Sequence, residues 1–366
     1  AFSRFVAARA ARVSAGEDVD HIELNPKTLL KPGRTSEDLP AILTAIGKRG
    51  SDALKSQHAE AFANTEAATT YGPDLVALVE DFQKETKLTP DGIIGPATIR
   101  ALTGHSNADK IARLELAMER LRWLPRDFGD RHVFINQPAY RATYRKDGEA
   151  EVSMRVVVGK KSNQTTFFYD EIETVEYNPY WGVPLSIIVN EMMPKLAKDP
   201  SYLDRAGYEV TTLRGSRVSS ASVDWYGVAT RSRSINVRQP PGPKNALGEL
   251  KILFPNKHAI YMHDTPAKRL FKKDRRAYSH GCIRLEDPRL MAAAVLGTNT
   301  DHIASQISKG KNLSEKVGGN VAVYSAYFTA WPTADGPLGY YDDVYGRDKA
   351  LDAAMTATVK ARSVAL

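Results

Sequence analysis

The sequence has 366 residues but only one cysteine, Cys282, which excludes an internal disulfide framework and a zinc site with several cysteines. It also lacks any apolar run near the roughly 18 residues that span a bilayer. Neither internal repeats nor low-complexity tracts are present. Hydrophobic residues make up 42% and charged residues 25%, which excludes disorder along the whole chain. At roughly 150 residues per domain, the length predicts two or three domains.

The charge balance is basic, with 50 Lys and Arg against 43 Asp and Glu, a net charge of +7. This balance favours an anionic partner such as an acidic polymer, an acidic membrane or nucleic acid. No recognised nucleic-acid-binding motif accompanies the charge, so we expect no nucleic-acid partner.

Residues 1–24 are predicted to be a helical segment. The chain begins with Ala1, and its first twelve residues carry three arginines and no acid, which is typical of an organellar targeting stretch. Phe2, Phe5 and Val6 nevertheless follow helical spacing. We therefore favour the last helix of an upstream region over the targeting interpretation.

Residues 25–105 are predicted to be a small helical domain. Three apolar stripes, in 39–46, 75–82 and 96–102, each mark a short helix, and 88–92 has turn chemistry. A core this small favours binding over chemistry. Residues 106–130 add a further stripe, which predicts a connector helix packed on the next domain.

The middle of the chain changes to period two, which predicts strands. Predicted strands cover 133–136, 141–144, 152–158, 174–177, 250–254, 259–263 and 321–328. A helical and then polar insertion, about 185–245, interrupts them, and such long insertions are often lids or binding surfaces. The fold class is therefore α+β.

The candidate chemistry lies between His263 and Cys282. A reactive thiol needs a base for its proton and donors for an oxyanion, and Gly281 leaves the backbone beside the cysteine open. Residues 255–289 carry nine Lys and Arg against four Asp and Glu, and a positive field lowers a cysteine pKa. Asp287 and Pro288 are expected to cap and begin a helix after this loop.

Composition alone leaves other interpretations open. A lone cysteine is commonly a buried, inert thiol, and His263 and His280 would then be histidines with satisfied hydrogen bonds. A metal site with His258, His263 and His280 as ligands is a third option, although no helical spacing or second cysteine supports it.

At these residues the sequence resembles the L,D-transpeptidases of bacterial cell walls, which have a YkuD-type catalytic domain. The family pattern is a histidine, about 14 to 17 residues, then Ser or Thr, His, Gly, Cys, a hydrophobic residue and Asn or Arg. Here fifteen residues separate His263 from the segment 279–284, which reads Ser-His-Gly-Cys-Ile-Arg. Every position of this long, spaced motif fits.

The resemblance extends over nearly the whole chain. Residues 71–75, 82–83 and 90–98 resemble the helical peptidoglycan-binding module often joined to such enzymes. Residues 178–184 and 245–248 resemble the large Gram-negative branch, in which a capping insertion separates these segments. The implied catalytic domain is 131–330, β-rich and β-sandwich-like, followed by a C-terminal tail at 331–366. Residues 1–24 correspond to the end of that branch's scaffold region.

The resemblance implies a role for each site residue. Cys282 is the nucleophile, His263 takes its proton, and the N–H groups of Gly281 and Cys282 form the oxyanion hole. The Asp264 backbone carbonyl orients His263, with the Asp264 side chain as the alternative. His280 shapes the loop and shares proton handling. Four residues are assigned to substrate binding, namely Arg284, Ser279, Tyr261 and Trp181. For Arg284 the alternative is an ion pair with Glu286 or Asp287. For Trp181 and Tyr261 the alternative is an ordinary role in the core.

The implied reaction forms 3→3 cross-links between peptidoglycan stem peptides, without cofactor or metal. A tetrapeptide stem is the acyl donor, the side-chain amine of a diamino acid in a second stem is the acceptor, and carbapenems are covalent inhibitors. The expected location is the periplasm or cell envelope of a Gram-negative bacterium. Two alternatives stay open: a cysteine peptidase that uses water or releases a linked lipoprotein, and a wall-binding protein without catalysis.

Overall fold

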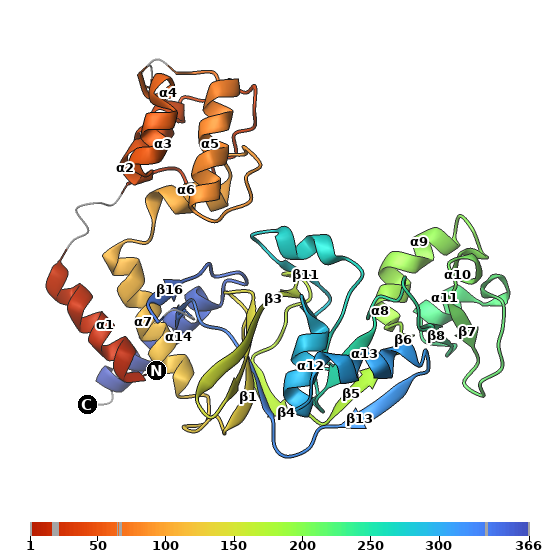
Figure 1. Ribbon diagram of the computed structural model, residues 1–366. Coiled ribbons are helices and arrows are strands. Elements are labelled where there is room, and N and C mark those ends of the chain that lie inside the picture. Colours follow the sequence, from red (N-terminus) through yellow and green to blue (C-terminus); the bar gives the residue numbers. More distant parts are fainter. Residues whose placement is uncertain (1, 17–21, 64, 66–67, 334–335, 365–366) are drawn as a thin grey trace. The chain divides into compact units, whose positions relative to one another are not determined.

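The computed structural model describes residues 2–16, 22–63, 65, 68–333 and 336–364 (Figure 1). The chain forms two compact units. One unit comprises residues 1–124, 272–275 and 328–366, and the other comprises residues 125–271 and 276–327. The second unit contains the candidate site.

The helical domain of the first unit has a core of its own. Its helices are α2 (Leu39–Arg49), α3 (Asp52–Gln57), α4 (Ala59–Ala63), α5 (Pro73–Glu85) and α6 (Pro96–Thr103). The three predicted helices correspond to α2, α5 and α6, whose buried residues include Ile42, Phe82 and Ile99. The unpredicted α3 and α4 are too short to show a periodic stripe. Ser51 begins α3 by accepting a hydrogen bond from the Leu54 N–H.

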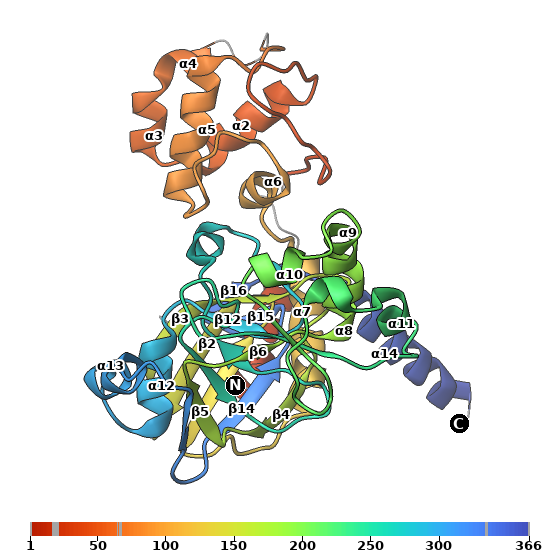
Figure 2. The same cartoon turned by 90° about the vertical axis from the view of Figure 1, so that its right-hand side faces the viewer.

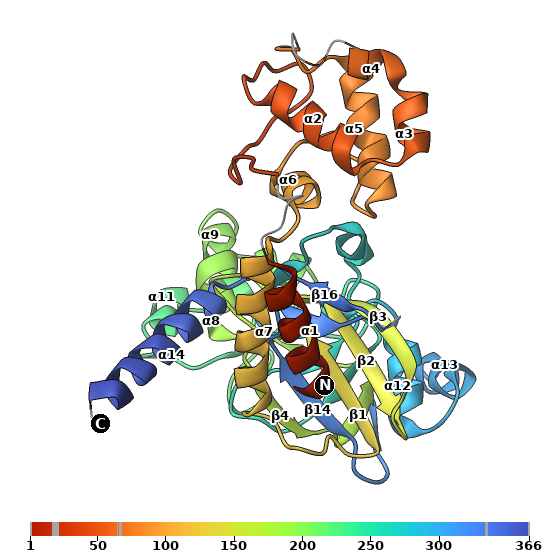
Figure 3. The same cartoon turned by 90° about the vertical axis from the view of Figure 1, so that its left-hand side faces the viewer.

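The N-terminal helix and the C-terminal segment belong to the same unit. There α1 (Phe2–Ala15) packs beside α7 (Asn107–Leu121), as Figure 3 shows, and β15 (Ala330–Pro332), β16 (Leu338–Tyr340) and α14 (Arg347–Val364) complete the group. The fully buried Phe5 lies edge-on to Trp331, with ring centroids 5.9 Å apart. Within this unit the main partners of α7 are α1, β15 and α14, and the packing of this helix on the next domain stays a prediction.

The second unit is built on a large curled sheet. Within the described residues its strand order is β13-β5-β9-β10-β12-β3-β2-β1-β14-β4, and β11 pairs with β3. The strands on the β1 side are β1 (Arg131–Asn136), β2 (Arg141–Lys146), β3 (Glu149–Gly159), β4 (Phe168–Glu171) and β14 (Ala322–Ala326). Those on the other side are β5 (Thr174–Tyr177), β9 (Leu250–Leu253), β10 (Met262–His263), β11 (Ala277–Ser279), β12 (Ile283–Leu285) and β13 (Leu313–Lys316). The predicted α+β class is confirmed.

The segment before β10 differs from its prediction. A strand was expected over 259–263, but β10 covers only Met262 and His263. Ala259 has φ +53°, a left-handed conformation that interrupts a strand. The Asn256 side chain holds this turn by accepting from the N–H groups of His258 and Ile260. The last predicted strand is likewise shorter, since β14 ends at Ala326.

Two helices, α12 (Pro288–Leu296) and α13 (Thr300–Ser308), lie next to each other beside the sheet (Figure 2). Asp287 caps α12 by accepting from the Leu290 N–H, and Pro288 opens it, as predicted. Gly297 ends α12 in a left-handed conformation with φ +71°. The cap matters for the site because β12 leads directly into this helix.

The insertion is a compact subdomain with its own core. A small sheet of β6 (Trp181–Gly182), β8 (Asn236–Gln239) and β7 (Glu209–Thr211) carries the short helices α8 (Leu185–Ile187), α9 (Met193–Leu196), α10 (Tyr202–Arg205) and α11 (Trp225–Ala229). The predicted helix at 185–196 contains a π-helical stretch, Ile188–Met192. Ile188, Leu203 and Val210 belong to the buried core. Among the helices of the described residues, none has the length and hydropathy of a bilayer-spanning segment.

We predict that Asp348→Ala destabilises the first unit. Arg120 is 2% exposed and donates to the Asp348 carboxylate at 2.6 Å, so the substitution leaves a buried guanidinium without this partner. Breaking a buried pair costs about 3 kcal/mol or more, and thermal unfolding should show a transition several degrees lower. Asp352→Ala, at an exposed position of the same helix, is the control and should unfold like the wild type. Equal transition temperatures for the two variants would contradict the prediction.

Candidate active site

The pairing of β10 with β12 brings the predicted residues together. The two strands are parallel, with Met262 opposite Ile283 and His263 opposite Arg284, and the Ile283 N–H donates to the Tyr261 carbonyl. Because side chains alternate along a strand, Tyr261, His263, Cys282 and Arg284 share one face. The ring centroids of Tyr261 and His263 are 5.7 Å apart, and the Cys282 Sγ donates to the Ala259 carbonyl at 3.7 Å.

The loop that carries Cys282 is held by two buried hydroxyl groups. Ser279 is 1% exposed, and its hydroxyl donates to the Cys282 carbonyl at 2.5 Å. The fully buried Thr165 hydroxyl donates to the Gly281 carbonyl at 2.7 Å. That Ser279 binds substrate stays a prediction, and in this structure its hydroxyl is engaged inside the loop. Sequence analysis missed Thr165, which lies far from the motif and carries no signal of its own.

Gly281 itself has φ +117°, a conformation that favours glycine. Its N–H donates to the Ser279 hydroxyl oxygen at 3.1 Å. That oxygen is free to accept because the hydroxyl proton is directed at the Cys282 carbonyl. One of the two predicted oxyanion donors is therefore engaged within the loop in this structure, and the pair stays a prediction. Within the described residues the Cys282 N–H has no hydrogen-bond partner, and it is the donor left to face an oxyanion.

His263 has the tautomer that a base needs. Its Nδ1 lies 2.5 Å from the Asp264 carbonyl oxygen, and since a carbonyl only accepts, Nδ1 carries the proton and Nε2 is the acceptor. Burial, reinforced by the nearby Arg284 charge, lowers the pKa of His263 to about 3. The imidazole is therefore neutral at physiological pH. The expected orientation by the Asp264 backbone carbonyl is found in the structure.

Cys282 differs from its prediction in charge. Burial raises the pKa of the Cys282 thiol above its ordinary value, although the neighbouring Tyr261 and the Arg284 charge oppose this rise. The nine basic residues of segment 255–289 do not outweigh the loss of hydration, because charge in solvent is screened and burial is not. The resting site is a neutral thiol beside a neutral imidazole.

Arg284 has no acidic partner among the described residues. Its alternative partners are occupied elsewhere, since Glu286 is hydrogen-bonded to Arg155 and Asp287 caps α12. The Arg284 Nε is buried without a hydrogen-bond partner in the described chain. The ion-pair alternative is therefore wrong, and a cation with an unused donor stands beside the thiol.

Two predicted residues have their contacts elsewhere. The exposed His280 is paired through Nε2 with Glu191 of the insertion at 2.7 Å, and Lys160 lies 3.3 Å from the same nitrogen. Trp181 packs on the core of the insertion, with its ring 6.5 Å from that of Tyr208, which supports the core role. His258 packs against Phe168, so the three histidines of the metal hypothesis have separate partners.

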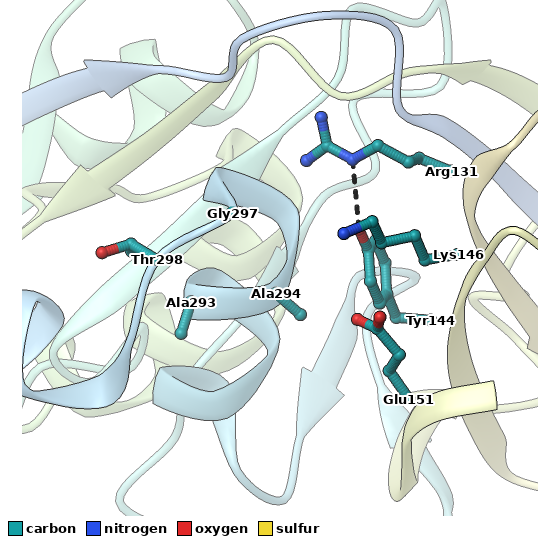
Figure 4. A pocket seen from close by; sticks show the side chains of 8 residues that line it. All are labelled: Arg131, Tyr144, Lys146, Glu151, Ala293, Ala294, Gly297 and Thr298. Atoms are coloured by element: carbon teal, nitrogen blue, oxygen red, sulfur yellow. Dashed lines mark hydrogen bonds between the residues drawn. The ribbon is translucent and has the colours of Figure 1, made fainter. Parts of the chain in front are cut away.

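A cavity of about 400 Å³ elsewhere in this unit contains none of the predicted site residues (Figure 4). It lies between the end of α12 and strands β1 to β3. Arg131 uses its donors on the Tyr144 hydroxyl and on the carbonyls of Val295 and Gly318. Arg131 therefore ties the C-terminus of α12 to the sheet.

Comparison with protein families agrees with the motif. Residues 130–316, half of the chain, match the model of the L,D-transpeptidase catalytic domain, YkuD. The chain belongs to this family. Residues 57–102 match a second model, described as "Putative peptidoglycan binding domain", so the L,D-transpeptidase domain follows a module of that family.

A curated relative, "Putative L,D-transpeptidase" of Haemophilus influenzae, is 33% identical over 245 residues, which cover 66% of this chain. The chain spans about half, 49%, of that relative's length. Among solved structures, an L,D-transpeptidase from Mycobacterium smegmatis has 14% identity and a TM-score of 0.26, covering 54% of this chain and 59% of its own. L,D-transpeptidase 3 from Mycobacterium tuberculosis, in complex with a faropenem-derived adduct, has 14% identity and a TM-score of 0.25, covering 54% and 60%.

We predict that alkylation of Cys282 in the L,D-transpeptidase domain accelerates with pH to beyond pH 9. The thiolate is the reactive form, and a thiol whose pKa is raised by burial yields it only at high pH. Iodoacetamide labelling from about pH 6 to about pH 11, followed by intact-protein mass, measures the profile, because the chain has one cysteine. A rate that levels off below about pH 8 would show a thiolate already present at rest.

Proposed function

We propose that the chain is a cysteine-dependent peptidoglycan L,D-transpeptidase that forms 3→3 cross-links. The observation that carries this proposal is the β10–β12 register, which aligns a thiol, a neutral imidazole acceptor, a phenol and an unpaired guanidinium on one face. The family match and the intact motif support the same activity.

In the first step, the Cys282 Sγ attacks the carbonyl of the diamino acid at position three of a tetrapeptide stem. The thiol proton moves to His263 Nε2 as the C–S bond forms, because neither residue is charged at rest. The Cys282 N–H and the Arg284 cation stabilise the developing oxyanion. The C–N bond then breaks, and the departing D-Ala amine takes the proton from His263.

In the second step, the side-chain amine of another stem attacks the thioester. The C–N bond forms, the C–S bond breaks, and the proton lost by the amine returns to the thiol by way of His263. Water competes with the amine at this step. The insertion reaches the catalytic loop through the Glu191–His280 pair, and this contact supports a role in limiting water.

The partners follow from the same proposal. Peptidoglycan stems act as donor and acceptor, the module at 57–102 binds the wall, and the reaction takes place in the periplasm of a Gram-negative bacterium. The net charge of +7 suits this anionic polymer. Arg284 is the candidate to bind a substrate carboxylate, and Tyr261 to contact the acyl donor beside the sulfur.

We predict that wild-type protein joins disaccharide-tetrapeptides into 3→3 dimers and that Cys282→Ala abolishes this product. No second cysteine can replace the nucleophile. Mass spectrometry of the products is the measurement, and matching circular dichroism spectra verify that the variant is folded. Shortened stems in place of dimers would identify water as the acceptor, and dimers formed by Cys282→Ala would rule out the thiol mechanism.

We predict that a carbapenem acylates Cys282 and that His263→Ala slows acylation near neutral pH by about 10²- to 10⁴-fold. A strained β-lactam carbonyl is open to attack by the sulfur, and the neutral imidazole is the acceptor for its proton. The mass increase of intact protein over time measures the rate. His302→Ala is the control. His302 is paired with Glu315, away from Cys282 in the sequence, and the variant should react like the wild type. If His263→Ala were acylated as fast as His302→Ala, another group would be the base.

A further inference from the structure

Asp264 connects the candidate base to a second network of contacts. Its backbone carbonyl accepts from His263 Nδ1, while its side chain is 8% exposed. One carboxylate oxygen accepts from the Glu249 N–H at 2.9 Å, and the other accepts from Lys268 Nζ at 2.7 Å. The backbone carbonyl of Asp264 is therefore held by the base, and its carboxylate is held by Glu249 and Lys268.

The Glu249 side of the network is built by a tight turn. Gly248 has φ +61°, and a Cβ there would lie 2.1 Å from the Asp264 carboxylate. The buried Asn245 amide holds the turn by donating to the carbonyls of Pro179, Gln239 and Pro240. The turn at 245–248, which sequence analysis recognised only by resemblance, thus closes around the Asp264 side chain.

The Lys268 side adds a charged contact. Its ammonium group also donates to the Glu286 carbonyl at 3.1 Å, next to the end of β12. Lys268 therefore bridges the strand of the base and the strand that follows the nucleophile. Asp264 and Lys268 line a cavity of about 590 Å³, and Arg289 lines it too but is paired with Glu249 at 2.6 Å.

We propose that the Asp264 carboxylate is a positioning group for His263. Two donors hold it, the Lys268 ammonium and the Glu249 N–H, and we call this pair the clamp. Gly248 allows the Glu249 backbone to come this close. The clamp fixes the rotation of the Asp264 residue, and with it the direction of the carbonyl that holds the imidazole. The inference rests on the proposed function, in which His263 is the base. Two donors converge on two oxygens, so a carboxylate satisfies both, whereas an amide satisfies one and opposes the other with its own N–H.

The test is a double-mutant cycle with carbapenem acylation near neutral pH as the readout. Asp264→Asn preserves the volume of the side chain, and we expect it to slow acylation about 10- to 100-fold, the scale on which a misplaced catalytic group acts. In a His263→Ala background the same substitution should change nothing, because the group it positions is gone. Alkylation by iodoacetamide at about pH 10.5, where thiolate forms without a base, should be unchanged in Asp264→Asn.

Lys268 supplies a second variant and Arg289 the matched control. Lys268→Met should slow acylation in the same direction, and Lys268→Arg should restore part of the rate. Since the Lys268 side chain is half exposed, this pair keeps the test decisive if Asp264→Asn does not fold. Arg289→Met removes a neighbouring ion pair of the same cavity and should react like the wild type.

The outcomes separate the two proposals. Slowing by Asp264→Asn or Lys268→Met that disappears in the His263→Ala background supports the clamp. Equal slowing in both backgrounds, or none in either, overturns it while leaving the transpeptidase proposal standing. A wild-type protein inert to carbapenem, or one unaffected by His263→Ala, overturns the assignment of His263 and the clamp with it.

Discussion

The site depends on one short parallel pairing. Between β10 and β12 only two residue pairs are in register, Met262 with Ile283 and His263 with Arg284. A shift by one residue would move His263 to the face opposite Cys282, since the side-chain period of a strand is two. The segment between the strands does more than return the chain, because Lys268 holds the Asp264 carboxylate and Ser279 holds the Cys282 carbonyl.

Burial decides the charge states within that register. The thiol and the imidazole both lose hydration, and each loss favours the neutral form. Arg284 adds a fixed positive charge that disfavours an imidazolium and favours a thiolate. The resting thiol and imidazole thus carry no opposite charges, and in the proposed reaction negative charge forms beside the Cys282 N–H and the Arg284 guanidinium. A thiol held in its neutral form is a weak nucleophile, because the thiolate is the reactive species.

The sequence allowed the strands and the motif to be predicted where the signals are local. Alternation identified 152–158 and 174–177, and an Asp before a Pro identified the start of α12. The failures concern properties that depend on distant groups. The direction of the Cys282 pKa shift depends on burial. The Gly281 N–H donates to the Ser279 hydroxyl, whose own proton points the other way. Thr165 donates to the Gly281 carbonyl from 116 residues away in the sequence.

The insertion begins and ends on neighbouring strands. Trp181 pairs with Gln239 and Gly182 with Arg238, so the chain leaves and rejoins the sheet-bearing part at adjacent points. More than fifty residues between them fold around a core of their own. A short turn could join the two points without disturbing the larger sheet, since closing a loop costs little when its ends already meet. The subdomain is thus an exchangeable module, and chimaeras that carry a different insertion on the same catalytic frame are geometrically accessible.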